Sequence, residues 1–159
     1  MSTAIERIMR ERGDLHCLHE PFLHYYYVHR ESKPLALFEV EEGHPTSYQD
    51  TRDSILRIAE NSPVFAKDMS YYVIPELLDD LEFCQRVQHC FLIRNPLKSI
   101  LSYYRLDPGL SLDEIGIEAQ WIHYQAIREM GQSPVILEAE QVQADTRKVM
   151  GAFWQALDI

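Results

Sequence analysis

The sequence predicts an α/β protein in which a parallel sheet is flanked by helices in three layers. Short apolar runs, which are typical of buried strands, alternate with longer segments whose apolar residues recur at helical spacing. Strands joined by helices of this length form parallel β-α-β units with right-handed crossovers. The 159 residues are 46% apolar, enough for one hydrophobic core, so residues 1–159 are predicted to form a single domain.

The first half of the chain predicts two helices and two strands. Apolar residues at helical spacing before Gly13 indicate an opening helix, and a capping pattern at Thr46 and Ser47 begins the second helix. Two short apolar runs indicate buried strands. The predicted helices are residues 2–12 and 47–62, and the predicted strands are residues 15–18 and 64–67. Residues 31–45 are predicted to form a polar excursion or lid.

The second half predicts further helices and two more strands. Pro75 and Pro96 each mark a helix start, because proline suits the first helical position. Gly131 ends a long helix whose apolar residues begin at Ile115. The predicted helices are residues 75–83, 96–105, 115–130 and 149–157, and the predicted strands are residues 87–93 and 135–137.

The charge balance restricts the partners. The chain has 25 Asp and Glu against 15 Lys and Arg, a formal net charge of −10, which argues against nucleic acid because its binding proteins neutralise phosphates with basic residues. No segment has the ~18 to 20 consecutive apolar residues of a membrane span, and the start lacks a signal-peptide pattern. We therefore predict a soluble, cytoplasmic protein that binds no membrane, in which any anionic ligand is held by a local site.

Cysteine and histidine do not indicate a metal site. The three cysteines form no C-x-x-C pair, so reduced, packed thiols are expected. Of seven histidines, a group crowds one segment, but its spacing fits no standard zinc pattern. We predict no metal. The crowded histidines are His16, His19, His24 and His29.

The segment from Cys90 to Tyr104 predicts an anion site. An apolar strand delivers Arg94 at its carboxyl end, Asn95 turns the chain, and Pro96 begins a helix that carries Ser102. A helix N-terminus offers unpaired N–H groups, and the Arg94 guanidinium adds a planar charged fork. A solvated arginine in an ordinary strand-to-helix turn is the alternative interpretation.

This segment resembles the 3′-phosphate-binding motif of P-loop sulfotransferases of the bacterial type, with Arg94 and Ser102 at the two phosphate-gripping positions. The resemblance extends over nearly the whole chain, to the terminal segment from Val135 onward. It implies a P-loop NTPase-like sulfotransferase fold and 3′-phosphoadenosine 5′-phosphosulfate (PAPS) as co-substrate. Ser2 and Thr3 match the last two positions of the loop that cradles the phosphosulfate. The strand expected before that loop is absent, as is the C-terminal extension that supplies a basic loop to the 3′-phosphate, so the resemblance implies a chain truncated at both ends.

The same resemblance implies catalytic roles at two strand ends. Glu20, in the His-Glu-Pro-Phe run, is the candidate general base, and His19 is the runner-up. Lys67, in a Lys-Asp-Met run, could meet the transferring sulfonate or the acceptor. Structural alternatives stay open: a capping or salt-bridged Glu20, and an ion pair between Lys67 and Asp68. Tyr25 to Tyr27, Tyr71 and Tyr72 either line an acceptor pocket or simply pack.

The predicted function is transfer of a sulfuryl group from PAPS to a hydroxyl or amine of a small-molecule or carbohydrate acceptor. Activity is expected only if the missing N-terminal loop is present in the native gene product. The alternative is a non-catalytic truncated remnant or scaffold that at most binds 3′,5′-phosphoadenosine. An exposed sheet edge would favour a homo-oligomer. A kinase or NTPase is excluded because the chain has no G-x-x-x-x-G-K-[ST] motif.

Overall fold

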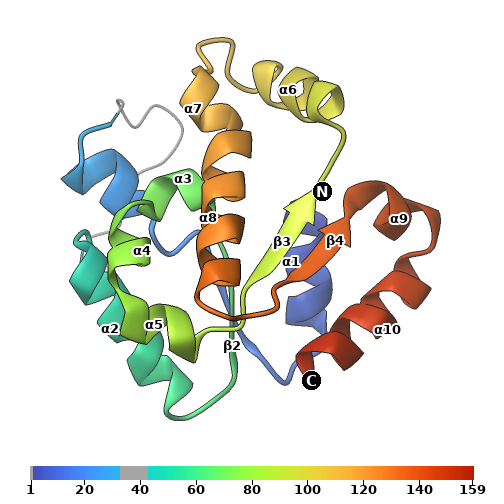
Figure 1. Cartoon of the computed structure of the whole chain (residues 1–159), viewed down its shortest axis with the longest axis horizontal. Helices are drawn as coiled ribbons and strands as arrows, with labels where there is room; N and C mark the ends of the chain where they lie inside the picture. Colours follow the sequence, from blue (N-terminus) through green and yellow to red (C-terminus); the bar gives the residue numbers. More distant parts are fainter. Residues whose placement is uncertain (1, 33–42) are drawn as a thin grey trace. The chain divides into compact units, whose positions relative to one another are not determined.

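The computed structural model describes residues 2–32 and 43–159 (Figure 1). The chain divides into two units, Met1–Glu76 and Leu77–Ile159. The single domain stays a prediction. Most of the predicted lid over residues 31–45 lies outside the described residues. Within the described ranges, no helix has both the length and the apolar character needed to cross a bilayer.

The first unit is built on two parallel strands. Strand β1 (His16–His19) pairs with β2 (Val64–Lys67), and the register places His16 opposite Val64 and His19 opposite Lys67. Helix α1 (Ser2–Glu11) contacts both strands. Because Ile5 and Met9 recur at helical spacing, α1 buries one apolar face, with Met9 fully inaccessible to solvent. Both strands and this helix lie where the sequence predicts them.

The remainder of the first unit consists of helical segments: η1 (Tyr25–His29), a π-helical turn, α2 (Tyr48–Ala59) and α3 (Ser70–Val73). The predicted start of α2 is confirmed, since the Ser47 hydroxyl accepts the backbone N–H of Asp50 at 3.0 Å. The Phe22 ring stacks on Tyr48, with ring centroids 5.3 Å apart. These rings continue the core that Ile5 and Met9 begin.

The second unit also contains one parallel pair. Strand β3 (Cys90–Ile93) pairs with β4 (Val135–Glu138), and Cys90 lies opposite Val135. Figure 1 shows the two arrows side by side, with α9 and α10 following β4 in red. The helices of this unit are α5 (Leu81–Arg86), α6 (Pro96–Tyr104), α7 (Leu112–Ile115), α8 (Ile117–Glu129), α9 (Ala139–Ala144) and α10 (Thr146–Leu157). A further short helix, α4 (Glu76–Asp79), spans the boundary between the units.

Three predicted boundaries are wrong for local reasons. The helix predicted over residues 75–83 is two helices, because the Asp80 carboxylate accepts the backbone N–H of Phe83 at 3.1 Å and so caps a new helix, α5. The predicted strand over residues 87–93 begins only at Cys90. The long helix is divided at Gly116, whose φ of 75° is left-handed and suits glycine.

The predicted sheet contains all four strands. In the described residues, hydrogen bonds instead join the strands in two separate pairs, β1 with β2 and β3 with β4. Each strand has only four residues, and its described ladder lies on one side only. The described residues combine helices with two short parallel strand pairs, and the α/β class stays a prediction. The three-layer sulfotransferase-type sheet stays a prediction.

Candidate functional site

The carboxyl ends of β1 and β2 bring four ionisable residues together. His19 ends β1 and lies opposite Lys67, which ends β2. Glu20 and Asp68 follow directly, and the ladder continues for one more bond because the Glu20 N–H donates to the Lys67 carbonyl at 2.7 Å. Parallel strands place the residues after them at one common edge, where ligands of open α/β sheets bind. The sequence-predicted catalytic residues therefore converge.

Lys67 and Glu20 form an ion pair that is largely removed from water. The Lys67 Nζ donates to Glu20 Oε1, and the two side chains are only 9% and 10% exposed. The Tyr72 hydroxyl, from α3, donates to Glu20 Oε2 at 3.2 Å. Each carboxylate oxygen of Glu20 thus accepts one hydrogen bond. The expected ion pair of Lys67 with Asp68 is wrong among the described contacts, because the partner of Lys67 is Glu20 across the ladder.

The backbone at Glu20 is unusual. Its φ of 46° is left-handed, a region that non-glycine residues enter rarely and at a cost of order 1 to 3 kcal/mol. Asp68 holds the turn that follows, since Oδ2 accepts the Phe22 N–H at 3.0 Å and Oδ1 accepts the Met69 N–H at 2.9 Å. Such backbone conformations cluster at functional sites.

Asp68 has a strongly perturbed pKa. Burial, which penalises the charged form, raises the pKa of Asp68 to about 7, and the neighbouring Glu20 charge adds to the rise. The two backbone N–H donors and Lys67 oppose it. Asp68 therefore exchanges its proton close to neutral pH.

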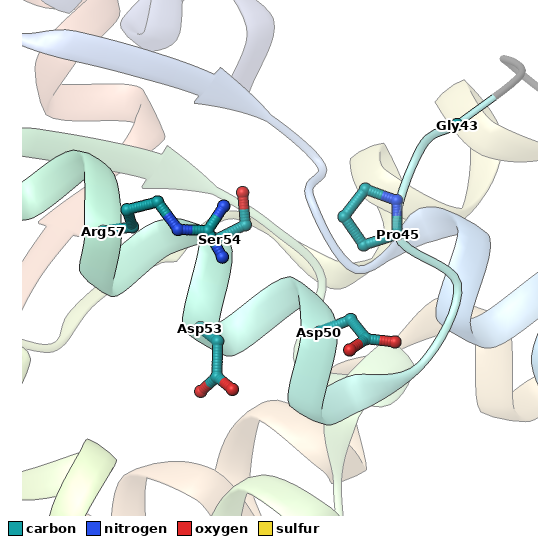
Figure 2. Close-up of a pocket in the computed structure, with 6 residues that line it drawn as sticks. All are labelled: Gly43, Pro45, Asp50, Asp53, Ser54 and Arg57. Atoms are coloured by element: carbon teal, nitrogen blue, oxygen red, sulfur yellow. The ribbon is translucent and has the colours of Figure 1, made fainter.

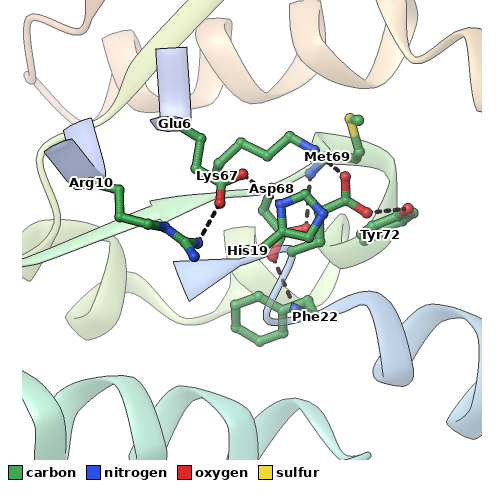
Figure 3. A network of polar contacts seen from close by, with 9 residues as sticks. Glu6, Arg10, His19, Phe22, Lys67, Asp68, Met69 and Tyr72 are labelled. Atoms are coloured by element: carbon green, nitrogen blue, oxygen red, sulfur yellow. Dashed lines mark hydrogen bonds and ion pairs between the residues drawn. The ribbon is translucent and has the colours of Figure 1, made fainter. Parts of the chain in front are cut away.

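Glu6 is a buried carboxylate that the sequence analysis missed. It lies on α1 with a side chain only 7% exposed, and it divides its oxygens between two partners. Oε1 accepts from Arg10 at 2.7 Å, and Oε2 lies 2.5 Å from His19 Nδ1. Glu6 is next to Ile5 and is one of the buried residues of α1. Figure 3 shows the Glu6 carboxylate facing the Arg10 guanidinium. A charged residue on an apolar helix face was the available signal.

Aromatic rings border the ion pair. The Tyr72 ring is 3% exposed and lies 5.0 Å from Tyr26, 5.8 Å from Tyr27 and 4.8 Å from Tyr71, measured between ring centroids. The guanidinium of Arg30 lies 5.7 Å above the Tyr26 ring. These contacts show that the predicted pocket aromatics pack against one another, and their role toward an acceptor stays a prediction.

The predicted phosphate residues lie elsewhere in the chain. Ser2 and Thr3 form the first turn of α1 in the first unit. Arg94 follows β3, and the exposed Ser102 lies on α6, both in the second unit. The predicted strand, turn and helix are therefore found. The single site that would unite Arg94 with Glu20 spans the two units and stays a prediction.

A carboxylate of the chain itself contacts the start of α6. The Asn95 side chain caps this helix by accepting the Lys98 N–H at 3.3 Å. The Asn95 N–H donates to Glu140 Oε1 at 3.4 Å, and the Lys98 Nζ lies 3.6 Å from the same oxygen. The pKa of Glu140 is lowered: burial opposes the change, but the Glu140 and Asn95 backbone N–H groups and Lys98 outweigh it. The turn thus makes the interactions of an ordinary capped helix start.

An open hollow of about 440 Å³ lies beside α2, apart from the predicted site residues. Figure 2 shows that its helical wall carries Asp50, Asp53, Ser54 and Arg57, and that Gly43 and Pro45 form the opposite wall. Two carboxylates and one guanidinium give it mixed charge. None of the residues predicted to bind an anion lines this hollow.

Metal-binding groups are not found in the part of the chain that the structure describes, where no cluster of three or more His, Cys, Asp or Glu has suitable geometry. The cysteines are free thiols: Cys84 is buried, and Cys17 and Cys90 are half-buried. Burial raises the pKa of the Cys84 and Cys90 thiols to about 11. They are therefore protonated, packed side chains at neutral pH.

Comparison with known proteins gives one curated relative to report. The chain is 27% identical to the Arabidopsis thaliana protein named "Branched-chain-amino-acid aminotransferase-like protein 2", over an alignment of 164 residues that covers all of this chain. That alignment covers 28% of the relative, so the chain spans little more than a quarter of the relative's length. No family model matches the chain, and no solved structure matches it.

This comparison overturns the predicted sulfotransferase assignment. The relative carries an aminotransferase-like name, so the predicted family and sulfuryl-transfer function, with the keywords that follow from them, are wrong on this finding. The physical reason is the shortness of the motifs: Ser2 with Thr3 begins a helix, and Asn95 caps another. The alternative of a truncated sulfotransferase remnant rested on the same motifs and loses its basis as well. The prediction that PAPS is the co-substrate stays untested.

Proposed function

We propose that this chain is part of an enzyme that binds a small amino-acid-like substrate at the carboxyl ends of β1 and β2 and moves a proton on the substrate's amino group. One observation carries the proposal. The ion pair of Lys67 and Glu20, with both side chains about one-tenth exposed, follows two parallel strands directly and rests on a left-handed Glu20 backbone.

The charges of this group suit a zwitterion. The Lys67 ammonium is a partner for an α-carboxylate, and the Glu20 carboxylate is a partner for an α-ammonium group. A bound amino acid would exchange the one internal ion pair for two pairs with the ligand. A charged hydrogen bond contributes roughly 1.5 to 3 kcal/mol, so each new pair offsets part of the cost of separating Lys67 from Glu20.

The relative supports the choice of ligand class. Its printed name refers to branched-chain amino acids, and the rings around Tyr72 offer apolar surface beside the ion pair. Because the chain spans only 28% of that protein, the activity in its name is not transferred to this chain. A small molecule or carbohydrate that carries a hydroxyl group is a second candidate ligand for the site at Lys67 and Glu20.

Calorimetry with three matched ligands tests the proposal. Leucine has both charges, leucinamide lacks the carboxylate, and 4-methylpentanoate lacks the amino group. We expect leucine to bind and each of the other two to bind about tenfold to a hundredfold more weakly, as the loss of one charged hydrogen bond predicts. Absence of leucine binding by the folded chain would contradict the proposal.

A pair of variants separates a ligand site from a structural ion pair. The double variant Lys67→Gln/Glu20→Gln keeps the shape and an internal hydrogen bond but removes both charges. The matched control is Arg7→Gln/Glu11→Gln, which neutralises an ion pair on α1 whose side chains are 81% and 66% exposed. We expect leucine binding to be lost in the first variant and kept in the second. Equal binding by both would show that the buried pair has only a structural role.

A further inference from the structure

His19 and Glu6 form a histidine–carboxylate pair beside the ion pair. His19 Nδ1 lies 2.5 Å from Glu6 Oε2, and the two side chains are 47% and 7% exposed. The buried member is therefore the carboxylate, and the imidazole extends from it toward solvent. The residues are 13 positions apart and come from α1 and β1, so the fold itself creates the contact.

The geometry decides where the imidazole carries its proton. A carboxylate only accepts hydrogen bonds, so a neutral His19 must have its hydrogen on Nδ1 to bond to Glu6. Nε2 then has a free electron pair. The hydrogen bonds described for His19 involve Nδ1 alone, which leaves Nε2 as the side-chain atom that can accept a substrate proton.

Glu20 is less suited to this task than the sequence suggests. Its two carboxylate oxygens already receive hydrogen bonds from Lys67 and Tyr72. Protonation of Glu20 would also remove the charge that pairs with the Lys67 ammonium, in a site that is only about one-tenth exposed. Proton transfer to His19, at the end of the same strand, leaves that ion pair intact.

We propose that Glu6 is a positioning residue that holds His19 with Nδ1 protonated, so that His19 Nε2 serves as the proton acceptor of the site. In this step an N–H or O–H bond of the substrate breaks and a new N–H bond forms at Nε2. The electron pair stays on the substrate atom, which becomes the nucleophile. The imidazolium that results faces the Glu6 carboxylate, which stabilises its charge.

Arg10 completes the arrangement from the solvent side. Its guanidinium donates to Glu6 Oε1, while its own side chain is 59% exposed. Glu6 and Arg10 are four residues apart on α1, a spacing at which side chains meet. This bond fixes the second oxygen of the carboxylate and so its orientation toward His19. The inference that His19 acts on a substrate rests on the proposed function; the orientation by Glu6 does not.

The tautomer of His19 can be measured without any ligand. In two-bond proton–nitrogen correlation spectra, a protonated ring nitrogen and one with a free electron pair have clearly different nitrogen shifts. The spectra are recorded over a series of pH values up to 9, so that the neutral ring is reached. We expect the proton on Nδ1 in the wild-type chain. A proton on Nε2 would overturn the proposal, whatever the substrate proves to be.

Variants then test whether Glu6 is the cause. Glu6→Met removes the acceptor but fills similar space, and we expect the proton to shift to Nε2, the form that free histidine prefers. Glu6→Gln retains an acceptor oxygen and should keep the proton on Nδ1. The control Glu11→Met alters an exposed carboxylate of the same helix and should change nothing. An unchanged tautomer in folded Glu6→Met would refute the positioning role.

Failure of the two proposals is distinguishable. If the tautomer depends on Glu6 but leucine does not bind, the amino-acid proposal fails and the pair stands. If leucine binds and His19→Gln binds it and reacts as well as the wild type, the proton acceptor is another group and this inference fails.

Discussion

His19 in the first unit and His123 in the second show how position alters one side chain. His19 is half-exposed and bonded to a carboxylate. His123 is 9% exposed, and its Nε2 lies 3.2 Å from His89 Nδ1, while His89 Nε2 lies 3.1 Å from the Cys84 carbonyl. Because the carbonyl only accepts, each of these two imidazoles has its proton on Nε2. This arrangement in the second unit requires both rings to be neutral.

Burial shifts the pKa values of the two units in opposite directions. Burial lowers the pKa of His123 to about 3, with the neighbouring His89 as a second cause, and burial also lowers the pKa of His89. In the first unit, burial instead raises the pKa of a carboxylate, Asp68, to about 7. The two units should therefore respond to pH in opposite senses.

The largest effect is expected at the buried ion pair. Lys67→Met leaves the Glu20 carboxylate without its cation in a site that is one-tenth exposed, and removing one partner of a buried pair costs about 3 to 5 kcal/mol. Chemical denaturation should show this decrease in unfolding free energy. The neutral pair Lys67→Gln/Glu20→Gln should lose less, and an equal loss would mean that shape rather than charge is decisive.

The second effect concerns acid. The folded-state pKa of His123 lies below its usual 6.5, so its contribution to stability is complete above about pH 6.5 and is lost as pH falls toward 3. At about 1.4 kcal/mol per pH unit, the loss between pH 6.5 and pH 4 is on the order of 3 to 4 kcal/mol. In His123→Gln, whose amide can still donate to His89, denaturation curves from pH 4 to 7 should be flatter.

Asp68 should give the opposite sign. Its folded-state pKa is raised to about 7, so its contribution is complete below about pH 4 and is lost as pH rises through 7. Asp68→Asn stays neutral throughout. The unfolding free energy of the variant relative to wild type should therefore increase from pH 4 to 8, on the order of 2 to 3 kcal/mol because partial solvent exposure weakens the burial effect. A constant difference would contradict the raised pKa.

The smallest effect is expected at the exposed pair on α1. Arg7 and Glu11 are 3.0 Å apart but mostly in water, and such pairs contribute little to stability. Arg7→Gln should therefore unfold at nearly the same denaturant concentration as wild type. A large shift would mean that exposure is a poor guide to which ion pairs matter in this chain.

Periodicity and capping residues were sufficient to locate the four strands and the starts of α1, α2, α4 and α6. The Ser47 and Asn95 caps act within three residues, and short-range signals of this kind are visible in a sequence. Contacts between residues far apart in the sequence could not be predicted in this way. The sequence left open an ion pair of Lys67 with its neighbour Asp68 and, separately, a salt-bridged Glu20, but it did not show that Lys67 and Glu20, 47 residues apart in sequence, are partners.

Glu6 was missed for a related reason. A glutamate in an amphipathic helix is usually solvated, and only the position of β1 shows that it meets His19. The family was misjudged because its motifs were short turns and caps that serve any strand-to-helix connection. Short-range signals thus located the strand ends, but not which side chains meet there.

The central claim is that the residues after β1 and β2 form a ligand site. The most direct measurement follows the side-chain nitrogen resonances of Lys67 and His19 while leucine is added to the folded chain. We predict that both shift together and saturate with one binding constant, and that the exposed Arg7 resonance stays fixed. Unchanged Lys67 and His19 signals at saturating leucine would contradict the account.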